Sequence, residues 1–137
     1  MSKKNLEIVR RAYTALSSGD SDVIAELSSP DFVTDFSRRL VDSFVLRGRD
    51  ETIAFIMDQS STEAWDGWPA REPQELIDAG DQVVAFIRFS AKGKASSAQV
   101  EAYVANLWTF GSDCKLIEMK YFGDDRAAAL EAAGLGE

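Results

Sequence analysis

The sequence contains no histidine and a single cysteine, and both facts exclude classes of chemistry. Without an imidazole, the chain cannot build a histidine-based catalytic triad or supply the most common metal ligand. Cys114 has no second thiol for an internal disulfide, a pattern typical of the reducing cytoplasm. The remaining candidate ligands are not clustered as a zinc site requires. We therefore expect no metal, no cofactor and a cytoplasmic location.

Long hydrophobic runs and excess positive charge are also absent. No apolar run approaches the roughly 20 residues that span a bilayer, and the opening MSKKNLEIVRRAY has no signal-peptide core. The net charge is −8, which argues against nucleic acid and anionic membranes as partners. The 137 residues are 45% hydrophobic and 28% charged. This composition predicts one globular domain over residues 1–137.

Hydrophobic periodicity predicts helices in the first part of the chain and strands in the second. Leu6, Val9, Tyr13 and Leu16 recur at helical spacing, and Gly19 ends that helix. Further helices are expected at 21–27, 50–57 and 124–133, and strands at 32–36, 43–46, 75–78, 83–91, 100–110 and 115–122. Short turns join the later strands into an antiparallel meander. The order of elements predicts an α+β fold.

Alternation along the last three strands predicts two different sheet faces, because successive side chains point to opposite sides. One face is apolar and collects Ala85, Ile87, Phe89, Tyr103, Ala105, Leu107, Ile117, Met119 and Tyr121. The other is mixed and collects Val84, Phe86, Arg88, Val104, Asn106, Trp108, Leu116, Glu118, Lys120 and Phe122. The mixed face either meets water, as in many two-layer sheets, or lines a cavity roofed by the helices.

The stretch AYVANLWTF, residues 102–110, bears on that choice. All of its positions but one are apolar, aromatic or β-branched, and the exception is the amide of Asn106. Burying an unpaired polar group costs about 1–3 kcal/mol. Asn106 is therefore a candidate polar contact in an otherwise apolar ligand cavity.

Several segments together resemble the SnoaL-like branch of the NTF2-like superfamily. They are NLEIVRRAYTALSSGDSDVIAELSSPDFVTDF, VLRGRDETIAFI, AGDQVVAFIRF, VEAYVANLWTF, KLIEMKYF and AAALEAAGL. The resemblance implies a cone, with N-terminal helices packed in a strongly curved antiparallel sheet around a central cavity. It also implies homodimers that form through the outer face of the sheet.

The same resemblance argues against a classical ketosteroid isomerase. That enzyme's oxyanion tyrosine falls on Ala12, with Tyr13 one position away, and its general base falls on Phe36, with Asp35 one position away. Its second oxyanion donor falls on Asn106. Two of the three roles are lost.

Acid–base chemistry of another kind would need a carboxylate. We expect Glu118 to be a cross-strand neighbour of Asn106 and to act as a base while Asn106 fixes a carbonyl or water. Asp35 is a second candidate base if its strand is bulged. In the structural alternative, Asn106 satisfies Glu118 and Asp35 is a solvated edge residue.

The predicted ligand is a small, largely hydrophobic molecule with a carbonyl or hydroxyl, of polyketide, terpenoid or steroid type. The predicted pocket residues are Asn106, Trp108, Arg88, Phe86, Lys120, Phe122, Tyr13, Trp65, Trp68 and Phe36. Trp65 and Trp68 either form the cavity rim or fill the core. Three hypotheses for the function stay open. The protein is a cofactor-free enzyme of isomerase, cyclase or hydrolase type, or a non-catalytic binding or dimerisation module, or a structural dimer with no cavity.

Overall fold

The structure is a computed structural model that describes residues 2–40, 43–60 and 65–135. In chain order its elements are α1 (Ser2–Ser18), α2 (Ser21–Leu27), β1 (Ser28–Asp35), β2 (Val45–Arg47), α3 (Arg49–Ser60), β3 (Ala70–Asp78), β4 (Gln82–Lys92), β5 (Gln99–Phe110), β6 (Leu116–Tyr121) and α4 (Arg126–Ala132). Helices lead and strands follow, which confirms the predicted α+β class. Within the described ranges, no helix is both long and apolar enough to cross a bilayer.

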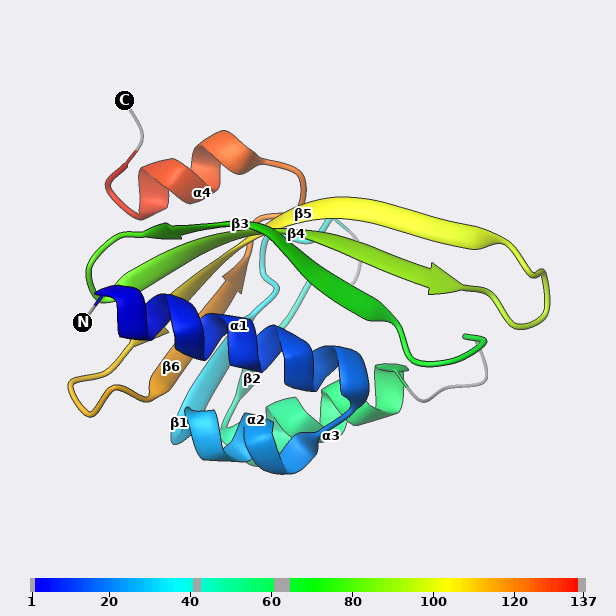
Figure 1. The fold of residues 1–137 in the computed structure, drawn as a ribbon, viewed down its shortest axis with the longest axis horizontal. Helices are drawn as coiled ribbons and strands as arrows, with labels where there is room; N and C mark the ends of the chain where they lie inside the picture. Colours follow the sequence, from blue (N-terminus) through cyan, green and yellow to red (C-terminus); the bar gives the residue numbers. More distant parts are fainter. Residues whose placement is uncertain (1, 41–42, 61–64, 136–137) are drawn as a thin grey trace.

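The strands form one curved sheet in the order β2-β1-β6-β5-β4-β3 (Figure 1). Neighbouring strands are antiparallel except for β1 and β6, which run parallel. The predicted antiparallel meander, β3 to β6, is confirmed, and the sheet as a whole is mixed because of this parallel pair. It arises because the last strand of the meander lies beside the first strand of the chain, and the two point in the same direction.

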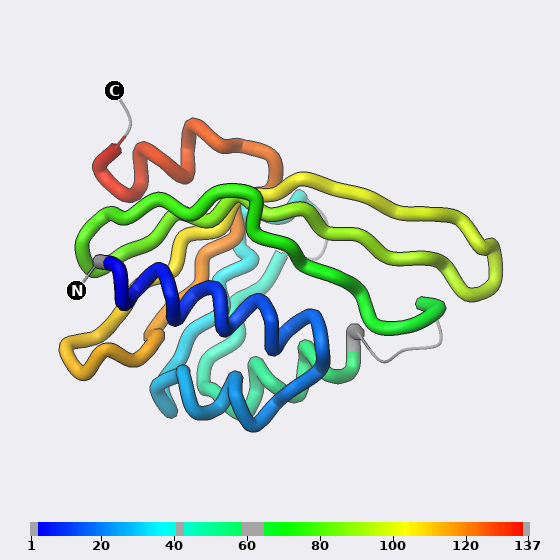
Figure 2. Tube along the Cα trace, viewed as in Figure 1, coloured from blue at the N-terminus to red at the C-terminus, as the bar shows by residue number. Residues whose placement is uncertain are grey.

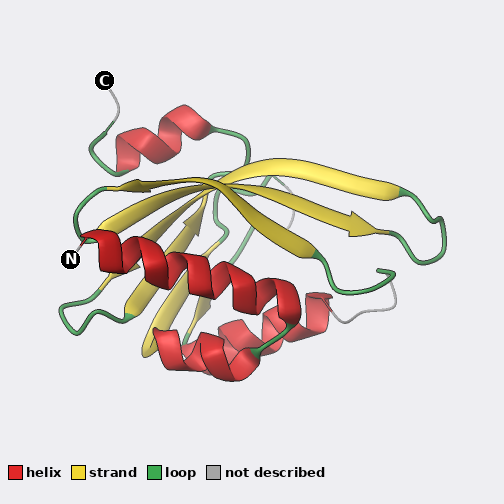
Figure 3. Ribbon diagram, in the orientation of Figure 1, coloured by secondary structure: helices red, strands yellow, loops and turns green. Residues whose placement is uncertain are grey.

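The helices cover the two faces of the sheet unequally (Figures 1 and 3). Helices α1, α2 and α3 lie on one side, which we call the inner face, and α4 lies on the opposite, outer face. The β4–β5 hairpin extends past the helices at its far end (Figure 2).

The turn between α1 and α2 depends on Gly19 and Asp20. Gly19 has φ +75°, and a Cβ there would lie 2.9 Å from the ring of Trp68. Glycine is the residue that meets both conditions, since it adopts positive φ freely and has no side chain. The Asp20 carboxylate then accepts a hydrogen bond from the Val23 N–H at 3.2 Å and caps α2.

Two apolar clusters hold the layers together. The inner cluster joins α1 and α2 to the inner face and includes Val9, Tyr13, Val83, Ile87 and Trp108. The outer cluster packs α4 on the outer face, where its buried members are Val84, Phe86, Ala105, Leu107, Phe122 and Ala129. The membership of both clusters overturns the predicted faces, because Ala85 and Ile87 lie inside with Trp108, whereas Ala105 and Leu107 lie outside with Phe86.

Candidate functional site

A cavity of about 440 Å³ lies between the inner face of the sheet and helices α1, α2 and α3. Its wall is mostly aliphatic and aromatic, and includes Leu16, Ile24, Leu27, Phe32, Phe36, Ile53, Phe55, Ile56, Ile87, Phe89, Val104, Trp108, Leu116 and Met119. Phe32 and Trp108 are almost fully buried, whereas Phe36 and Phe89 are partly exposed. The wall therefore combines buried aromatic rings with partly exposed ones.

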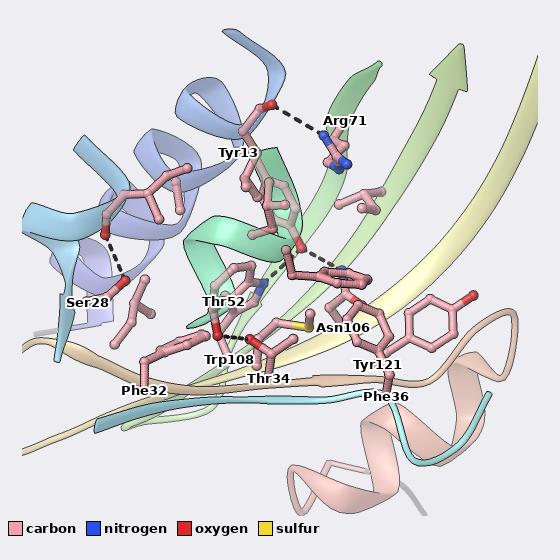
Figure 4. A pocket seen from close by; sticks show the side chains of 18 of the residues that line it. Tyr13, Ser28, Phe32, Thr34, Phe36, Thr52, Arg71, Asn106, Trp108 and Tyr121 are labelled. Atoms are coloured by element: carbon pink, nitrogen blue, oxygen red, sulfur yellow. Dashed lines mark hydrogen bonds between the residues drawn. The ribbon is translucent and has the colours of Figure 1, made fainter. Parts of the chain in front are cut away.

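A cluster of three polar side chains, Tyr13, Asn106 and Trp108, stands in the wall of the cavity (Figure 4). The Tyr13 hydroxyl accepts hydrogen bonds from Asn106 Nδ2 at 2.8 Å and from Trp108 Nε1 at 2.9 Å. The Trp108 ring also meets the Tyr13 ring edge to face, with centroids 5.4 Å apart. All three side chains are at most 5% exposed. We call this set the tyrosine cluster.

The tyrosine cluster is one partner short of full hydrogen bonding. Asn106 Oδ1 is buried and accepts no hydrogen bond from any described residue. Because the Tyr13 oxygen already accepts two hydrogen bonds, its own hydrogen is not used within the cluster. If the Asn106 amide turns by 180°, Tyr13 donates to Oδ1 instead, and the Nδ2 hydrogens become the unused ones. In either orientation the cluster has a donor hydrogen to offer.

Burial fixes the protonation state of Tyr13. Desolvation raises the pKa of its phenol to about 12, against the opposing effects of the Asn106 and Trp108 hydrogen bonds and the charge of Arg71. The hydroxyl is therefore protonated at neutral pH, and it can donate a hydrogen bond but does not serve as a base.

A second polar contact in the wall joins β1 to α3. The hydroxyl oxygens of Thr34 and Thr52 lie 2.8 Å apart, and both residues are buried. One hydroxyl donates to the other, so each has one partner, and the hydrogen of the accepting hydroxyl is not used in this pair.

The charged residues of the wall are Arg39, Arg49 and Arg71, and the described lining residues include no Asp, Glu or His. Among the described residues there is also no group of three or more His, Cys, Asp or Glu that could hold a metal ion. The described lining can donate hydrogen bonds and hold negative charge, but it offers no carboxylate base.

The structure places four of the predicted pocket residues in the wall, namely Tyr13, Phe36, Asn106 and Trp108. Trp65 and Trp68 are not among the lining residues. Trp68 packs on Gly19, and its Nε1 donates to the Leu16 carbonyl at 2.6 Å. Trp65 meets the Phe89 ring edge to face.

Ala85, Asn106 and Tyr121 are aligned across β4, β5 and β6, and all three face inward. Their neighbours along β4 and β6, which include the other predicted site residues of those strands, therefore face outward. Phe86 and Phe122 pack under α4. Arg88 forms ion pairs with Glu72, at 2.9 Å, and with Glu101. Lys120 is aligned with Leu107 and with Asp35.

The expected pairing of Asn106 with Glu118 is wrong, because Asn106 is aligned with Tyr121 and Glu118 with Thr109. A register shift in β6 puts both Leu116 and Met119 in the cavity wall and leaves Glu118 on the outer face. To act as a base in this cavity, Glu118 would have to reach it from the opposite side of its strand.

Asp35, the other predicted base, is not a lining residue and is held as a carboxylate. Its pKa is lowered, because the Ser37 hydrogen bonds and the charges of Lys120 and Arg47 outweigh the raising effect of burial. The Ser37 N–H donates to Asp35 Oδ1 at 2.8 Å. A lowered pKa makes Asp35 a weaker base at neutral pH.

Sequence reasoning missed several wall residues, among them Arg39, Arg49, Arg71, Thr34 and Thr52. For Ile87 and Phe89 the sequence did contain the information that places them on the same face as Asn106, in the length of the turn between the two strands. If residue 91 is paired with residue 100 across the predicted turn, the alignment that follows is 85 with 106, which is the pairing observed. The arginines carried no such signal, because they come from three separate segments.

Comparison with solved structures defines the class of fold. An NTF2-like protein from Burkholderia xenovorans LB400 is 19% identical, with 97% of each chain covered and a TM-score of 0.71. The epoxide hydrolase/cyclase-like enzyme SalBIII, from pyran ring formation in salinomycin, is 21% identical over 88% of this chain and 91% of its own, with a TM-score of 0.71. RV0760c from Mycobacterium tuberculosis, in complex with estradiol-17β-hemisuccinate, is 11% identical over 86% and 92%, with a TM-score of 0.70.

At these identities the likeness establishes the NTF2-like fold and no particular activity. The sequence itself adds the family, since the SnoaL-like domain matches residues 9–119. The chain belongs to the SnoaL-like domain family, as its resemblance predicted. No curated protein matches it.

Proposed function

We propose that the protein binds a largely apolar small molecule in the cavity, and that the tyrosine cluster donates a hydrogen bond to an oxygen of that ligand. The observation that carries the proposal is a buried cluster in the wall of an apolar cavity in which Asn106 Oδ1 has no partner among the described residues and one donor hydrogen is unused. An unsatisfied buried polar group costs about 1–3 kcal/mol. A ligand hydroxyl that donates to Oδ1, or a ligand oxygen that accepts from the unused donor, would offset that cost.

The size and lining of the cavity fit such a ligand. About 440 Å³ falls within the roughly 300–1,000 Å³ of small-molecule sites, which are mostly apolar with a few placed polar groups. A polyketide, terpenoid or steroid-like molecule with a carbonyl or hydroxyl has the matching chemistry. The complex of RV0760c with a steroid ester lends this class support.

The experiment is a thermal-shift and calorimetry screen of steroids and related apolar ketones and alcohols, with estradiol among them. A ligand present at 100 times its Kd stabilises the folded state by about 2.7 kcal/mol, a shift that is readily measured. Binders are then compared in wild type, Tyr13→Phe and the control Tyr121→Phe. Tyr121 also lines the cavity but is outside the tyrosine cluster.

We expect Tyr13→Phe to weaken binding about tenfold or more, since the hydroxyl is either the donor to the ligand or the partner that holds the Asn106 amide in place. Tyr121→Phe should change affinity little. If no apolar compound binds wild type, or if the two variants behave alike, the proposal is wrong.

A cofactor-free acid–base enzyme of isomerase, cyclase or hydrolase type is the second candidate, and the hydrolase/cyclase-like relative SalBIII favours it. In this chain Tyr13 could polarise a carbonyl, but the described lining supplies no base. Turnover of any bound compound that is lost in Glu118→Gln or Asp35→Asn would support this candidate. Binding without turnover supports the ligand-binding module instead.

A further inference from the structure

The charged groups of the cavity wall all have one sign. Arg39, Arg49 and Arg71 line the cavity, no acidic residue does so among those described, and yet the chain has a net charge of −8. A cavity lined by cations within an acidic protein attracts an anion in preference to a neutral molecule. The protein surface as a whole would repel the same anion.

Two of these arginines have other contacts. Arg49 donates from Nη1 to the carbonyls of Ala25 and Ser28, each at 3.4 Å. Its buried Nε lies 3.8 Å from the Asp50 carboxylate and has no hydrogen-bond partner among the described residues. Arg39 lies over the rings of Phe36 and Phe44, at 5.6 and 5.4 Å from their centroids. The Arg49 contacts join α2, β1 and α3.

Arg71 is the wall arginine whose charge acts on Tyr13, and Figure 4 labels it among the lining side chains. It comes from β3, its Nη1 donates to the Leu16 carbonyl at 3.3 Å, and its guanidinium lies 5.5 Å from the Phe89 ring centroid. It is close enough to Tyr13 for its charge to lower the pKa of the phenol. A guanidinium has five N–H donors in a planar fork, the geometry that matches a carboxylate.

We infer that the ligand is an apolar carboxylate whose charged end is held between the Arg71 guanidinium and the tyrosine cluster. The inference rests on the proposed function and specifies its ligand class. A carboxylate only accepts hydrogen bonds, so it fits the cluster with the Asn106 amide turned, where Tyr13 donates to Oδ1 and the Nδ2 hydrogens are the unused groups. The apolar remainder of the ligand lies along Phe89, Ile87 and Val104 in the wall.

Arg71 also has a structural role that the test must separate from binding. The Leu16 carbonyl near the end of α1 accepts from both Arg71 and Trp68 Nε1. Loss of Arg71 would therefore loosen this corner even if no anion binds. The discriminating readout is the ratio of affinities for a charged and a neutral ligand of one shape, because loosening weakens both alike.

The probes are 2-naphthylacetate and 2-naphthylethanol, which share the apolar body and differ in the charged end. Their Kd values are measured by calorimetry at pH 7 in wild type, Arg71→Gln, Arg71→Lys and the control Arg11→Gln. The control makes the same charge change on the exposed side of α1, where Arg11 pairs with Glu26. Circular dichroism and melting confirm that each variant is folded.

Wild type is expected to bind the carboxylate about tenfold or more tightly than the alcohol. In an apolar cavity without cations the order would be reversed, because burying an unpaired carboxylate is costly. Arg71→Gln should remove the preference and leave the alcohol affinity within about threefold. Arg71→Lys should keep part of the preference, and Arg11→Gln all of it.

Three results would overturn the inference. If the alcohol binds and wild type shows no preference for the carboxylate, the ligand class is wrong while the proposed function stands. If the preference persists in Arg71→Gln, the anion is held elsewhere. If neither probe binds and the steroid screen is also silent, both proposals fail. Should Arg71→Gln not fold, the wild-type preference and the Arg71→Lys ratio decide the question.

Discussion

The Tyr13 hydroxyl accepts hydrogen bonds from two buried donors, so its removal leaves both without a partner. Tyr13→Phe keeps the ring and its contact with Trp108 but leaves Asn106 Nδ2 and Trp108 Nε1 without a hydrogen-bond acceptor. We expect a loss of about 1–3 kcal/mol in the free energy of unfolding, measured by urea titration. Tyr121→Phe is the control. A Tyr13→Phe variant as stable as wild type would show that the cluster contributes nothing to folding.

The raised pKa of Tyr13 also predicts how stability depends on pH. The phenol has a pKa of about 12 in the folded protein, above the ordinary value of 10.0, so the folded state holds the proton more tightly. The resulting stabilisation is complete below pH 10 and is lost as the pH rises from 10 toward 12. The slope there is about 1.4 kcal/mol per pH unit from this group.

This pH dependence can be measured as a difference between wild type and Tyr13→Phe. Urea midpoints from pH 8 to pH 11.5 should fall more steeply for wild type above pH 10, and the tyrosinate absorbance near 295 nm that Tyr13→Phe removes should appear only above pH 10. If that absorbance appears at or below pH 10, Tyr13 is not desolvated as described.

At the scale of elements, the turn between α1 and α2 offers a matched pair of glycine substitutions. Gly19 and Gly80 have similar positive φ values, +75° and +80°, but only Gly19 has a neighbour in the way of a Cβ. Alanine at either site costs about 1–2 kcal/mol for the left-handed backbone. Gly19→Ala should cost more than Gly80→Ala in urea unfolding, because Trp68 must also move. Equal losses in the free energy of unfolding would mean that the Trp68 ring can move away from the new methyl group at no cost.

The sequence predicted most elements and their order, but it did not settle how neighbouring strands align. Alternation was read correctly within β5, so Asn106 and Trp108 were placed together. Which residues of β4 and β6 share a face with Asn106 depends on how these strands are aligned with β5. An alignment that is wrong by one residue moves every side chain of the strand to the other face. That error placed Arg88 and Phe86 beside Asn106, when Ala85 is its partner.

The candidate site was predictable only where its residues lie on elements with clear periodicity. Tyr13 falls on the buried stripe of α1, and Asn106 is a conspicuous amide in an apolar strand. Arg71 looks like any charged residue near a turn until the fold brings β3 against α1. A register shift in β6 likewise cannot be read from alternation, so Glu118 was placed on the wrong face.

At the scale of the whole molecule, the homodimer stays a prediction whose surface must be redrawn. The apolar part of the outer face is already covered by α4, so it is not free to pair with a second copy. What remains of that face is polar, with Arg88 between Glu72 and Glu101, and the aligned Tyr103 is 57% exposed. Tyrosines are enriched at protein interfaces, so we predict that a dimer would form through this end of the β4–β5 hairpin.

Light scattering at micromolar concentration tests this surface. We expect a dimer for wild type and a shift toward monomer for Tyr103→Glu, since the new carboxylate would stand beside Glu101 and Glu72 and face their counterparts across a two-fold axis. Ligand affinity should not change, because Tyr103 lies on the face opposite the cavity. A monomeric wild type would end the dimer prediction. A dimer that survives Tyr103→Glu would move the interface to another surface, while lost ligand binding in that variant would mean that the two faces of the sheet are coupled.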